Sequence, residues 1–169
     1  MEEHWRSLLR EAYRVAGKES NDPSTQNGAL IINREGHVLV SGWNRLPPGI
    51  AANPDRLMPP LKYRCVVHAE QAVICEAARK GVALAGLTMV CPWVACVPCA
   101  CAIISAGIAR LVMHEDAFRK TPYRWRDEVT AARNLFFEAG VEVVSCSGTV
   151  NDSRLDKVKI RFDGAVWYP

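Results

Sequence analysis

The sequence lacks the features by which several classes of protein are recognised. No apolar run approaches the roughly 18–20 residues of a membrane-spanning helix, and no repeat or low-complexity tract is present. Its 21 lysines and arginines exceed its 18 acidic residues by only three, too small an excess for a dedicated nucleic-acid or membrane binder. The first residues, Met1 to Arg6, are acidic and then amphipathic, whereas a signal peptide starts basic and continues apolar. We therefore expect a cytoplasmic protein.

The length and composition are those of one soluble globular domain. The chain has 169 residues, of which 49% are hydrophobic and 23% are charged. We expect a single domain over residues 1–150 and a C-terminal tail over residues 151–169. Within that tail, Asp163-Gly164 separates two apolar runs, Val158–Phe162 and Ala165–Tyr168, which predicts a β-hairpin with a type I′ turn.

Cysteine is the feature of the composition that needs an explanation, because the chain has seven. An odd number of cysteines, in a chain without a secretion signal, argues against a framework of disulfides. It favours a metal site, with some buried thiols besides.

Hydrophobic periodicity predicts an alternation of helices and strands, and five prolines between residues 46 and 60 predict an irregular surface segment. The last strands alternate with helices and should be parallel, while the first two strands should form an antiparallel pair. This pattern predicts an α/β fold whose sheet has helices on both faces. The predicted helices span residues 4–17 (ended by Gly17), 68–80, 96–106 and 126–139, and the predicted strands span residues 29–32, 38–43, 87–90, 110–113 and 141–145.

Two short motifs carry the chemistry. Cys96 and Cys99 lie three residues apart at the predicted start of a helix, so both sulfurs face the same side. His68 opens the helix before it, and its ring can point toward the same spot. Two cysteines and one histidine can bind one zinc ion and leave the fourth tetrahedral position open for water, as catalytic zinc sites do. Zinc lowers the pKa of such a water to about 7.

Glu70 follows the histidine by two residues, at the same predicted helix start. Its carboxylate can there reach the bound water without binding the metal, which suits a group that carries a proton from water to substrate. His-x-Glu followed by Cys-x-x-Cys is the signature of the zinc nucleobase deaminases, although Ala95 stands here where that signature has proline. The two neighbouring cysteines, Cys91 and Cys101, are expected to be buried thiols.

Together with further segments, these motifs resemble the deoxycytidylate (dCMP) deaminases, especially their phage-like members. The resemblance covers about residues 5–145. It implies the cytidine deaminase fold, in which a five-stranded mixed sheet forms the middle of three α/β/α layers and zinc lies between two helix N-termini. The matching segments are Asp22–Gln26, Gly42–Asn44, His68–Glu70, Cys96–Cys99, Ser105–Ile108, Ala131–Arg133 and Ala139–Val141.

The resemblance also implies a function. It implies hydrolysis of dCMP to dUMP and ammonia by a zinc-bound hydroxide, with one catalytic zinc ion per chain and Glu70 as the proton shuttle. It implies a homo-oligomer as well, for which a hexamer is one candidate. The remaining roles that it implies are zinc binding by His68, Cys96 and Cys99, and a place beside the nucleotide for Asn44, Ser24 and Thr25.

The segment from Lys120 to Arg126 mixes cations with aromatic side chains. Such residues bind phosphates and stack on bases, so we expect Lys120, Tyr123 and Arg126 to contact the substrate.

Two other functions stay open at this point. Gly42-Trp-Asn-Arg45 also resembles the tRNA adenosine deaminases, so a tRNA base or a modified nucleotide is an alternative substrate. The nearly neutral charge favours a small nucleotide over a nucleic acid as the partner. A zinc-stabilised interaction module is the non-enzymatic alternative, and it would need a fourth protein ligand and no acid beside the metal.

Overall fold

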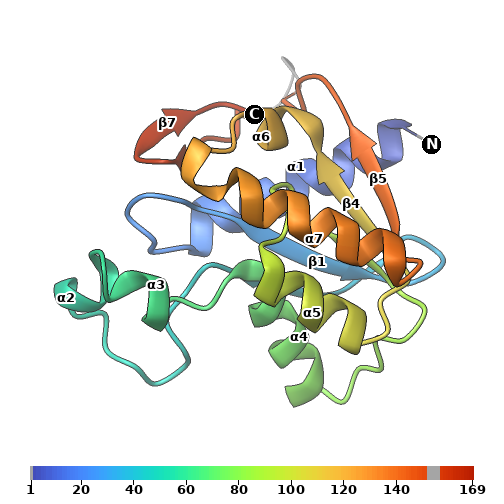
Figure 1. The fold of residues 1–169 in the computed structure, drawn as a ribbon, viewed down its shortest axis with the longest axis horizontal. Helices are drawn as coiled ribbons and strands as arrows, with labels where there is room; N and C mark the ends of the chain where they lie inside the picture. Colours follow the sequence, from blue (N-terminus) through green and yellow to red (C-terminus); the bar gives the residue numbers. More distant parts are fainter. Residues whose placement is uncertain (1, 152–156) are drawn as a thin grey trace.

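A five-stranded mixed sheet forms the centre of the computed structural model, which describes residues 2–151 and 157–169 (Figure 1). The strand order is β2-β1-β3-β4-β5. β1 pairs antiparallel with β2 and with β3, whereas β3, β4 and β5 run parallel, which confirms the predicted mixed sheet. The strands are β1 (Gly28–Ile32), β2 (Val38–Trp43), β3 (Thr88–Val90), β4 (Arg110–His114) and β5 (Glu142–Cys146).

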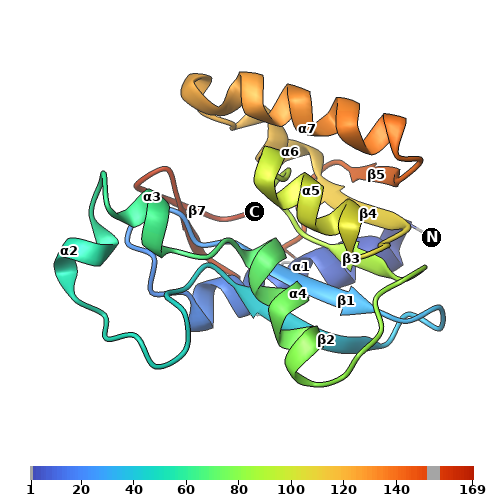
Figure 2. The same ribbon diagram turned by 60° about the horizontal axis from the view of Figure 1, so that its bottom comes forward.

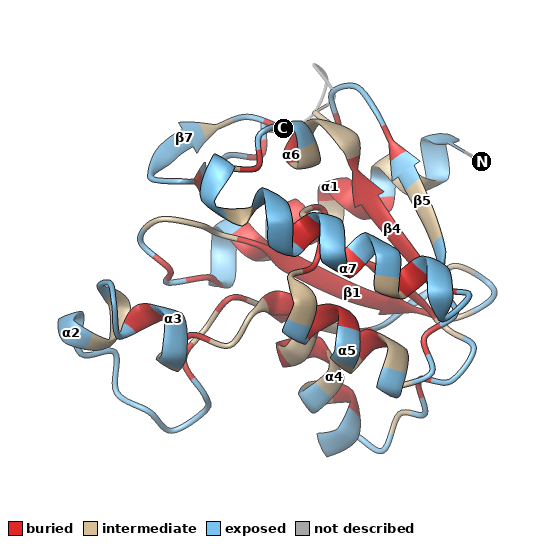
Figure 3. Ribbon diagram, in the orientation of Figure 1, coloured by how far each residue is buried: buried red, intermediate tan, exposed pale blue. Residues whose placement is uncertain are grey.

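Helices cover both faces of the sheet, as predicted (Figure 1, Figure 2). Ile31 of β1 belongs to the core cluster on one face, and its neighbour Leu30 belongs to the cluster on the other. Every residue of β1 is buried, which explains its continuous apolar run (Figure 3). No helix in the described part of the chain is long and apolar enough to cross a bilayer. One face carries α1 (Glu2–Glu19), and the other carries α4 (Ala69–Arg79), α5 (Val97–Ser105) and α7 (Arg126–Glu138).

The first helix is longer than predicted, because Gly17 does not end it. The backbone of the C-terminal tail passes directly over this residue, and a Cβ there would lie 2.7 Å from the carbonyl oxygen of Lys159. Glycine therefore allows the tail to approach α1 closely, while the helix continues to Glu19. Ile160 and Phe162 of the tail are buried in the same core cluster as α1.

The proline-rich segment between β2 and α4 is mostly irregular, as predicted. It contains two short helices, α2 (Pro54–Leu57) and α3 (Lys62–Cys65), which the sequence analysis did not anticipate. Figure 2 shows this segment projecting beyond the sheet before the chain returns to begin α4. The end of the segment therefore lies beside the start of α4, where it contributes residues to the site described below.

The predicted hairpin is present in the C-terminal tail, where β6 (Ile160–Phe162) pairs antiparallel with β7 (Ala165–Trp167). Asp163 and Gly164 at its turn have φ values of 49° and 83°, and a type I′ turn requires positive φ at both positions. Residues 152–156 of the predicted tail lie outside the described residues, and the domain boundary at residue 150 stays a prediction. The remaining short elements are α6 (Glu115–Arg119) and the 3-10 helix η1 (Tyr123–Trp125).

Candidate functional site

Two helices that pack against each other bring the predicted metal ligands together. His68 is the N-cap of α4, and Cys96 is the N-cap of α5. Cys99 lies in the first turn of α5. Pro98 precedes it at the start of the helix, where its missing N–H removes no intrahelical hydrogen bond.

The distances between these three side chains fit one tetrahedral zinc ion. Their ligand atoms all lie within 4.8 Å of one another, and they are the one such group among the described residues. The sulfurs of Cys96 and Cys99 lie 3.5 and 3.6 Å from Nδ1 of His68. Zinc–sulfur and zinc–nitrogen bonds of about 2.3 and 2.0–2.1 Å at the tetrahedral angle separate S and N by about 3.6 Å. The group has three members in the described chain, one fewer than a structural zinc site needs.

The protonation chemistry of the cluster also fits a metal. The neighbouring Cys99 and His68 lower the pKa of Cys96. The interaction with Cys96 in turn raises the pKa of Cys99, and it raises the pKa of His68 to about 9. The positive end of each helix also favours negative charge here. Both effects favour the thiolate of Cys96, the form in which cysteine binds zinc.

Glu70 lies beside this cluster in the first turn of α4, and only 3% of its surface is exposed. Its Oε2 atom has no hydrogen-bond partner among residues 2–151 and 157–169. Burial raises the pKa of Glu70 to about 7, while the nearby His68 opposes the rise. A buried carboxylate oxygen without a partner is destabilising unless a ligand satisfies it, so it independently indicates that something binds at this point.

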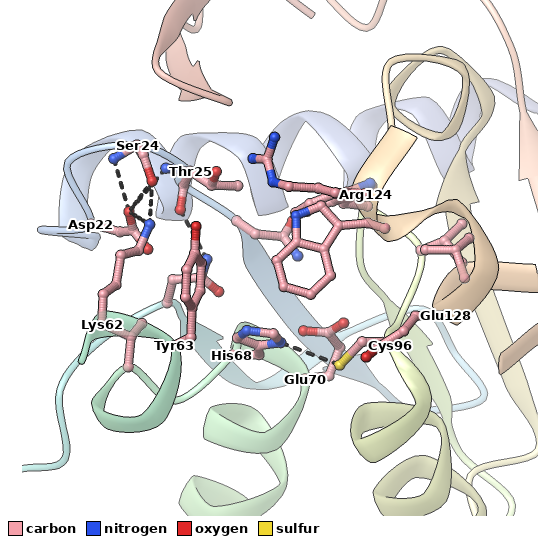
Figure 4. A pocket seen from close by; sticks show the side chains of 17 residues that line it. Asp22, Ser24, Thr25, Lys62, Tyr63, His68, Glu70, Cys96, Arg124 and Glu128 are labelled. Carbon is pink, nitrogen blue, oxygen red and sulfur yellow. Dashed lines mark hydrogen bonds and ion pairs between the residues drawn. The ribbon is translucent and has the colours of Figure 1, made fainter. Parts of the chain in front are cut away.

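A pocket adjoins the cluster (Figure 4). His68, Cys96 and Glu70 lie on one side of it, and Ser24, Thr25 and Arg124 lie on the other. The pocket therefore offers metal-binding groups at one end and hydroxyl and cationic groups at the other. Its lining consists of Asp22, Ser24, Thr25, Asn27, Asn44, Lys62, Tyr63, Val66, His68, Glu70, Trp93, Val94, Cys96, Arg124, Trp125, Glu128 and Val129.

Three of the expected substrate residues, Asn44, Ser24 and Thr25, line this pocket. The amide of Asn44 is buried and joins two of its walls. Its Oδ1 accepts the N–H of Ala69 (2.9 Å), and its Nδ2 donates to the carbonyl of Thr25 (2.9 Å). The first of these bonds satisfies a free N–H at the start of α4, so Asn44 sets the position of that helix relative to the loop.

A buried ion pair, which the sequence analysis missed, supports the same loop. Nζ of Lys62 lies 2.7 Å from Oδ1 of Asp22, and the two side chains are 8% and 2% exposed. Lys62 also donates to the hydroxyl of Ser24. Asp22 accepts the backbone N–H groups of Ser24 and Thr25, each at 2.9 Å. No local pattern marks Lys62, because it lies in a single helical turn 38 residues from Ser24.

The structure does not bring the other three expected substrate residues to the pocket. Lys120 lies over the ring of Trp167, with its Nζ 5.4 Å from the ring centroid. Tyr123 is 85% exposed, and the guanidinium of Arg126 lies over its ring. None of the three lines the pocket.

Arg124 and Trp125 line the pocket in their place. The reason is the 3-10 helix η1, in which residues three apart lie on the same side. Positions 123 and 126 therefore face outward together, and positions 124 and 125 do not share that face. The ring of Trp125 meets the ring of Tyr63 edge to face, with their centroids 5.8 Å apart.

The two cysteines nearest the cluster have different environments. Cys91 is buried, as expected, and accepts a hydrogen bond from the side chain of Asn27 (3.2 Å). Cys101 is exposed, so the prediction of a buried thiol is wrong there. It follows Cys99 by two residues, which is about 200° around a helix, and that side of α5 faces solvent.

Comparison with known proteins places this site in a family context. Residues 2–115 match the family described as the cytidine and deoxycytidylate deaminase zinc-binding region. The deoxycytidylate deaminase of Homo sapiens is 32% identical over 151 residues, covering 82% of this chain and 79% of that protein. An uncharacterized deaminase of Aliivibrio fischeri is 30% identical over 139 residues, covering 82% and 91%. The dCMP deaminase of cyanophage S-TIM5, in complex with dCMP and dUMP, has the same fold, with a TM-score of 0.64, 24% identity and coverage of 82% and 93%.

Proposed function

The chain belongs to the cytidine and deoxycytidylate deaminase family of zinc-binding proteins, and we propose that it hydrolyses dCMP to dUMP and ammonia. The observation that carries the proposal is the buried Glu70 carboxylate, which has an oxygen without a partner in the described chain and lies beside three zinc ligands. The same pocket carries cationic and hydroxyl groups on its opposite side. A nucleotide has a base at one end and a phosphate at the other, which matches these two sides.

His68, Cys96 and Cys99 would hold the zinc ion. Zinc bound there supplies a water whose pKa is lowered to about 7. A non-catalytic interaction module would need a fourth protein ligand, but the described residues supply three. Glu70 next to them also disfavours that alternative, because a purely structural site has no use for a buried acid.

Glu70 is the proposed proton carrier. Its Oε2 accepts a proton from the attacking water as the water oxygen bonds to C4 of the cytosine, and it then donates that proton to N3. The same carboxylate moves the remaining proton of the added hydroxyl to the exocyclic nitrogen. The bond between C4 and that nitrogen breaks, ammonia leaves, and C4 becomes the carbonyl carbon of uracil.

Lys62, Ser24 and Arg124 are the proposed phosphate ligands. All three line the pocket, and Ser24 and Arg124 lie on the side opposite Glu70. A monophosphate carries nearly two negative charges, for which lysine and arginine are charge-assisted donors. The aromatic pair of Tyr63 and Trp125 lines the same pocket and supplies apolar area for the nucleoside.

The test is ammonia release from dCMP, CMP, 5-substituted dCMP, dCTP, deoxycytidine, dAMP and a tRNA. We expect the highest kcat/KM for dCMP. Arg124→Ala should lower kcat/KM for dCMP about 10–150-fold, because one charge-assisted contact is lost, and should leave deoxycytidine unaffected. Lys120→Ala is the matched control, because it removes a cation from the same segment outside the pocket lining. Equal turnover of deoxycytidine and dCMP by the wild type would contradict the proposal.

We further propose that the reaction takes place in the cytoplasm. All seven cysteines are free thiols, which suits a reducing compartment. The expected homo-oligomer, with a hexamer as one candidate, stays a prediction that light scattering on the purified protein can test.

A further inference from the structure

The C-terminal hairpin of β6 and β7 lies against the loop of residues 22–27, which lines the pocket. The N–H of Gly164 donates to the carbonyl of Ser24, and the N–H of Gln26 donates to the carbonyl of Arg161, both at 2.8 Å. The N–H of Arg161 donates in turn to Oε1 of Gln26, also at 2.8 Å. The hairpin therefore supports a wall of the pocket, although none of residues 160–167 is part of the lining.

Buried contacts hold the hairpin itself in place. Ile160 and Phe162 are 2% and 7% exposed and pack in the core cluster that contains α1. The ring of Phe162 also meets the ring of Trp93, with centroids 4.9 Å apart, and Trp93 lines the pocket. The residue at the hairpin turn, Asp163, therefore has a defined position relative to the pocket.

Asp163 forms an ion pair with Arg124. The side chain of Arg124 is 54% exposed, and an arginine so exposed loses conformational entropy when a ligand orders it. The hydrogen bond to Asp163 uses Nη2 of Arg124, and a guanidinium has five N–H donors in all. The remaining donors can therefore reach a ligand while Asp163 holds the group. Figure 4 shows Arg124 on the side of the pocket that also carries Thr25.

We propose that Asp163 is a positioning residue that holds the guanidinium of Arg124 ready for the phosphate of the substrate. This inference rests on the proposed function, and it concerns a residue outside the segment that matches the family. The carboxylate of Asp163 is 43% exposed and already paired, so solvent screens its repulsion of the phosphate. We expect the gain from ordering Arg124 in advance to exceed that repulsion, which would appear as a lower KM in the wild type than in a variant without this carboxylate.

Asp163→Asn tests the role while it preserves the turn, because asparagine readily adopts the positive φ of this position (49°). We expect KM for dCMP to rise about 2–10-fold with kcat unchanged, and kcat/KM for deoxycytidine, which has no phosphate, to stay the same. In an Arg124→Ala background, Asp163→Asn should have no further effect, because no guanidinium is left to position. Asp127→Asn is the matched control, since it removes the same charge from α7 outside the pocket lining.

Binding measured without turnover provides a second readout. In Glu70→Gln protein, the Kd of dCMP by titration calorimetry should rise by the same factor when Asp163→Asn is added. An unchanged KM overturns the positioning role, and a lower KM overturns it by identifying Asp163 as a competitor of the phosphate. An equal loss with deoxycytidine overturns it in favour of a structural role. A wild type that does not prefer dCMP to deoxycytidine overturns the proposed function, and the role of Asp163 with it, before any variant is made.

Discussion

Replacing Lys62 by methionine removes the ammonium group from its buried pair with Asp22 and keeps most of the apolar stem. The charged atoms lie 2.7 Å apart, and the side chains are 8% and 2% exposed. The variant therefore leaves the carboxylate of Asp22, which is almost completely buried from solvent, without its counter-charge. Breaking a buried pair in this way lowers the free energy of unfolding by about 3–5 kcal/mol.

We expect a loss of about 3 kcal/mol, at the lower end of that range, because Asp22 keeps other donors. Its Oδ1 also accepts the N–H groups of Ser24 and Thr25 and the hydroxyl of Ser24, and these bonds stabilise the charged carboxylate. Asp22→Asn combined with Lys62→Met removes both charges and keeps an oxygen that can accept the two N–H groups. The double variant should lie within about 1 kcal/mol of the wild type, because replacing a buried pair as a whole changes stability little.

Urea unfolding at pH 7 measures these changes, with zinc at one fixed concentration because a ligand of the folded state adds to the apparent stability. At an m value of about 2 kcal/mol/M, Lys62→Met should lower the midpoint by about 1.5 M. Lys80→Met is the matched control, because its ammonium lies 3.6 Å from Glu76 on a side chain that is 53% exposed, and its shift should stay below about 0.5 M. A Lys62→Met midpoint within about 0.3 M of the wild type, or a double variant as unstable as the single one, would refute the reasoning.

Three further predictions concern the metal, the acid and pH. Cys96→Ser or Cys99→Ser should lose the zinc measured by elemental analysis, whereas Cys101→Ser, at an exposed position, should retain it. Glu70→Gln should lower kcat about 10²–10⁴-fold with zinc retained, and near-normal turnover would mean that another group carries the proton. Burial lowers the pKa of His114 in the folded protein. Below the ordinary histidine pKa of about 6.5, His114 is therefore protonated in the unfolded chain while it is still neutral in the folded one. Between about pH 7.5 and 5.5 the free energy of unfolding of the wild type should therefore fall relative to that of His114→Gln; urea midpoints that run parallel in the two proteins would contradict this.

The cysteine pair of the candidate zinc site could be predicted because its signal is local. Cys96 and Cys99 lie within one helical turn, and Pro98 marks the start of that helix, so the geometry of the cysteine pair depends on a few adjacent residues. The same holds for the hairpin, where Asp163 and Gly164 adopt the positive φ that their dipeptide indicates. Backbone preferences of adjacent residues suffice for both.

The side of the pocket that is proposed to bind phosphate could not be predicted in the same way. The composition of residues 120–126 predicts that this segment contacts the substrate, and the segment does reach the pocket. Composition alone does not indicate which of its side chains face the pocket. The rotation of η1 decides that Arg124 lines the pocket and that Tyr123 does not, and this rotation depends on how the segment packs. Lys62 carries no local signal, because its partner Asp22 is brought beside it only when the segment before α4 folds back.

Local sequence is enough to predict the alternation of helices and strands, the cysteine pair of α5 and the hairpin turn, because each depends on periodicity or on φ preferences of neighbouring residues. Tertiary structure decided which distant groups meet. It places the C-terminal tail against Gly17 of α1, buries Lys62 against Asp22, and brings Asp163 to Arg124. These contacts join residues that are far apart in the chain and meet only in the assembled fold, so no local pattern indicates them.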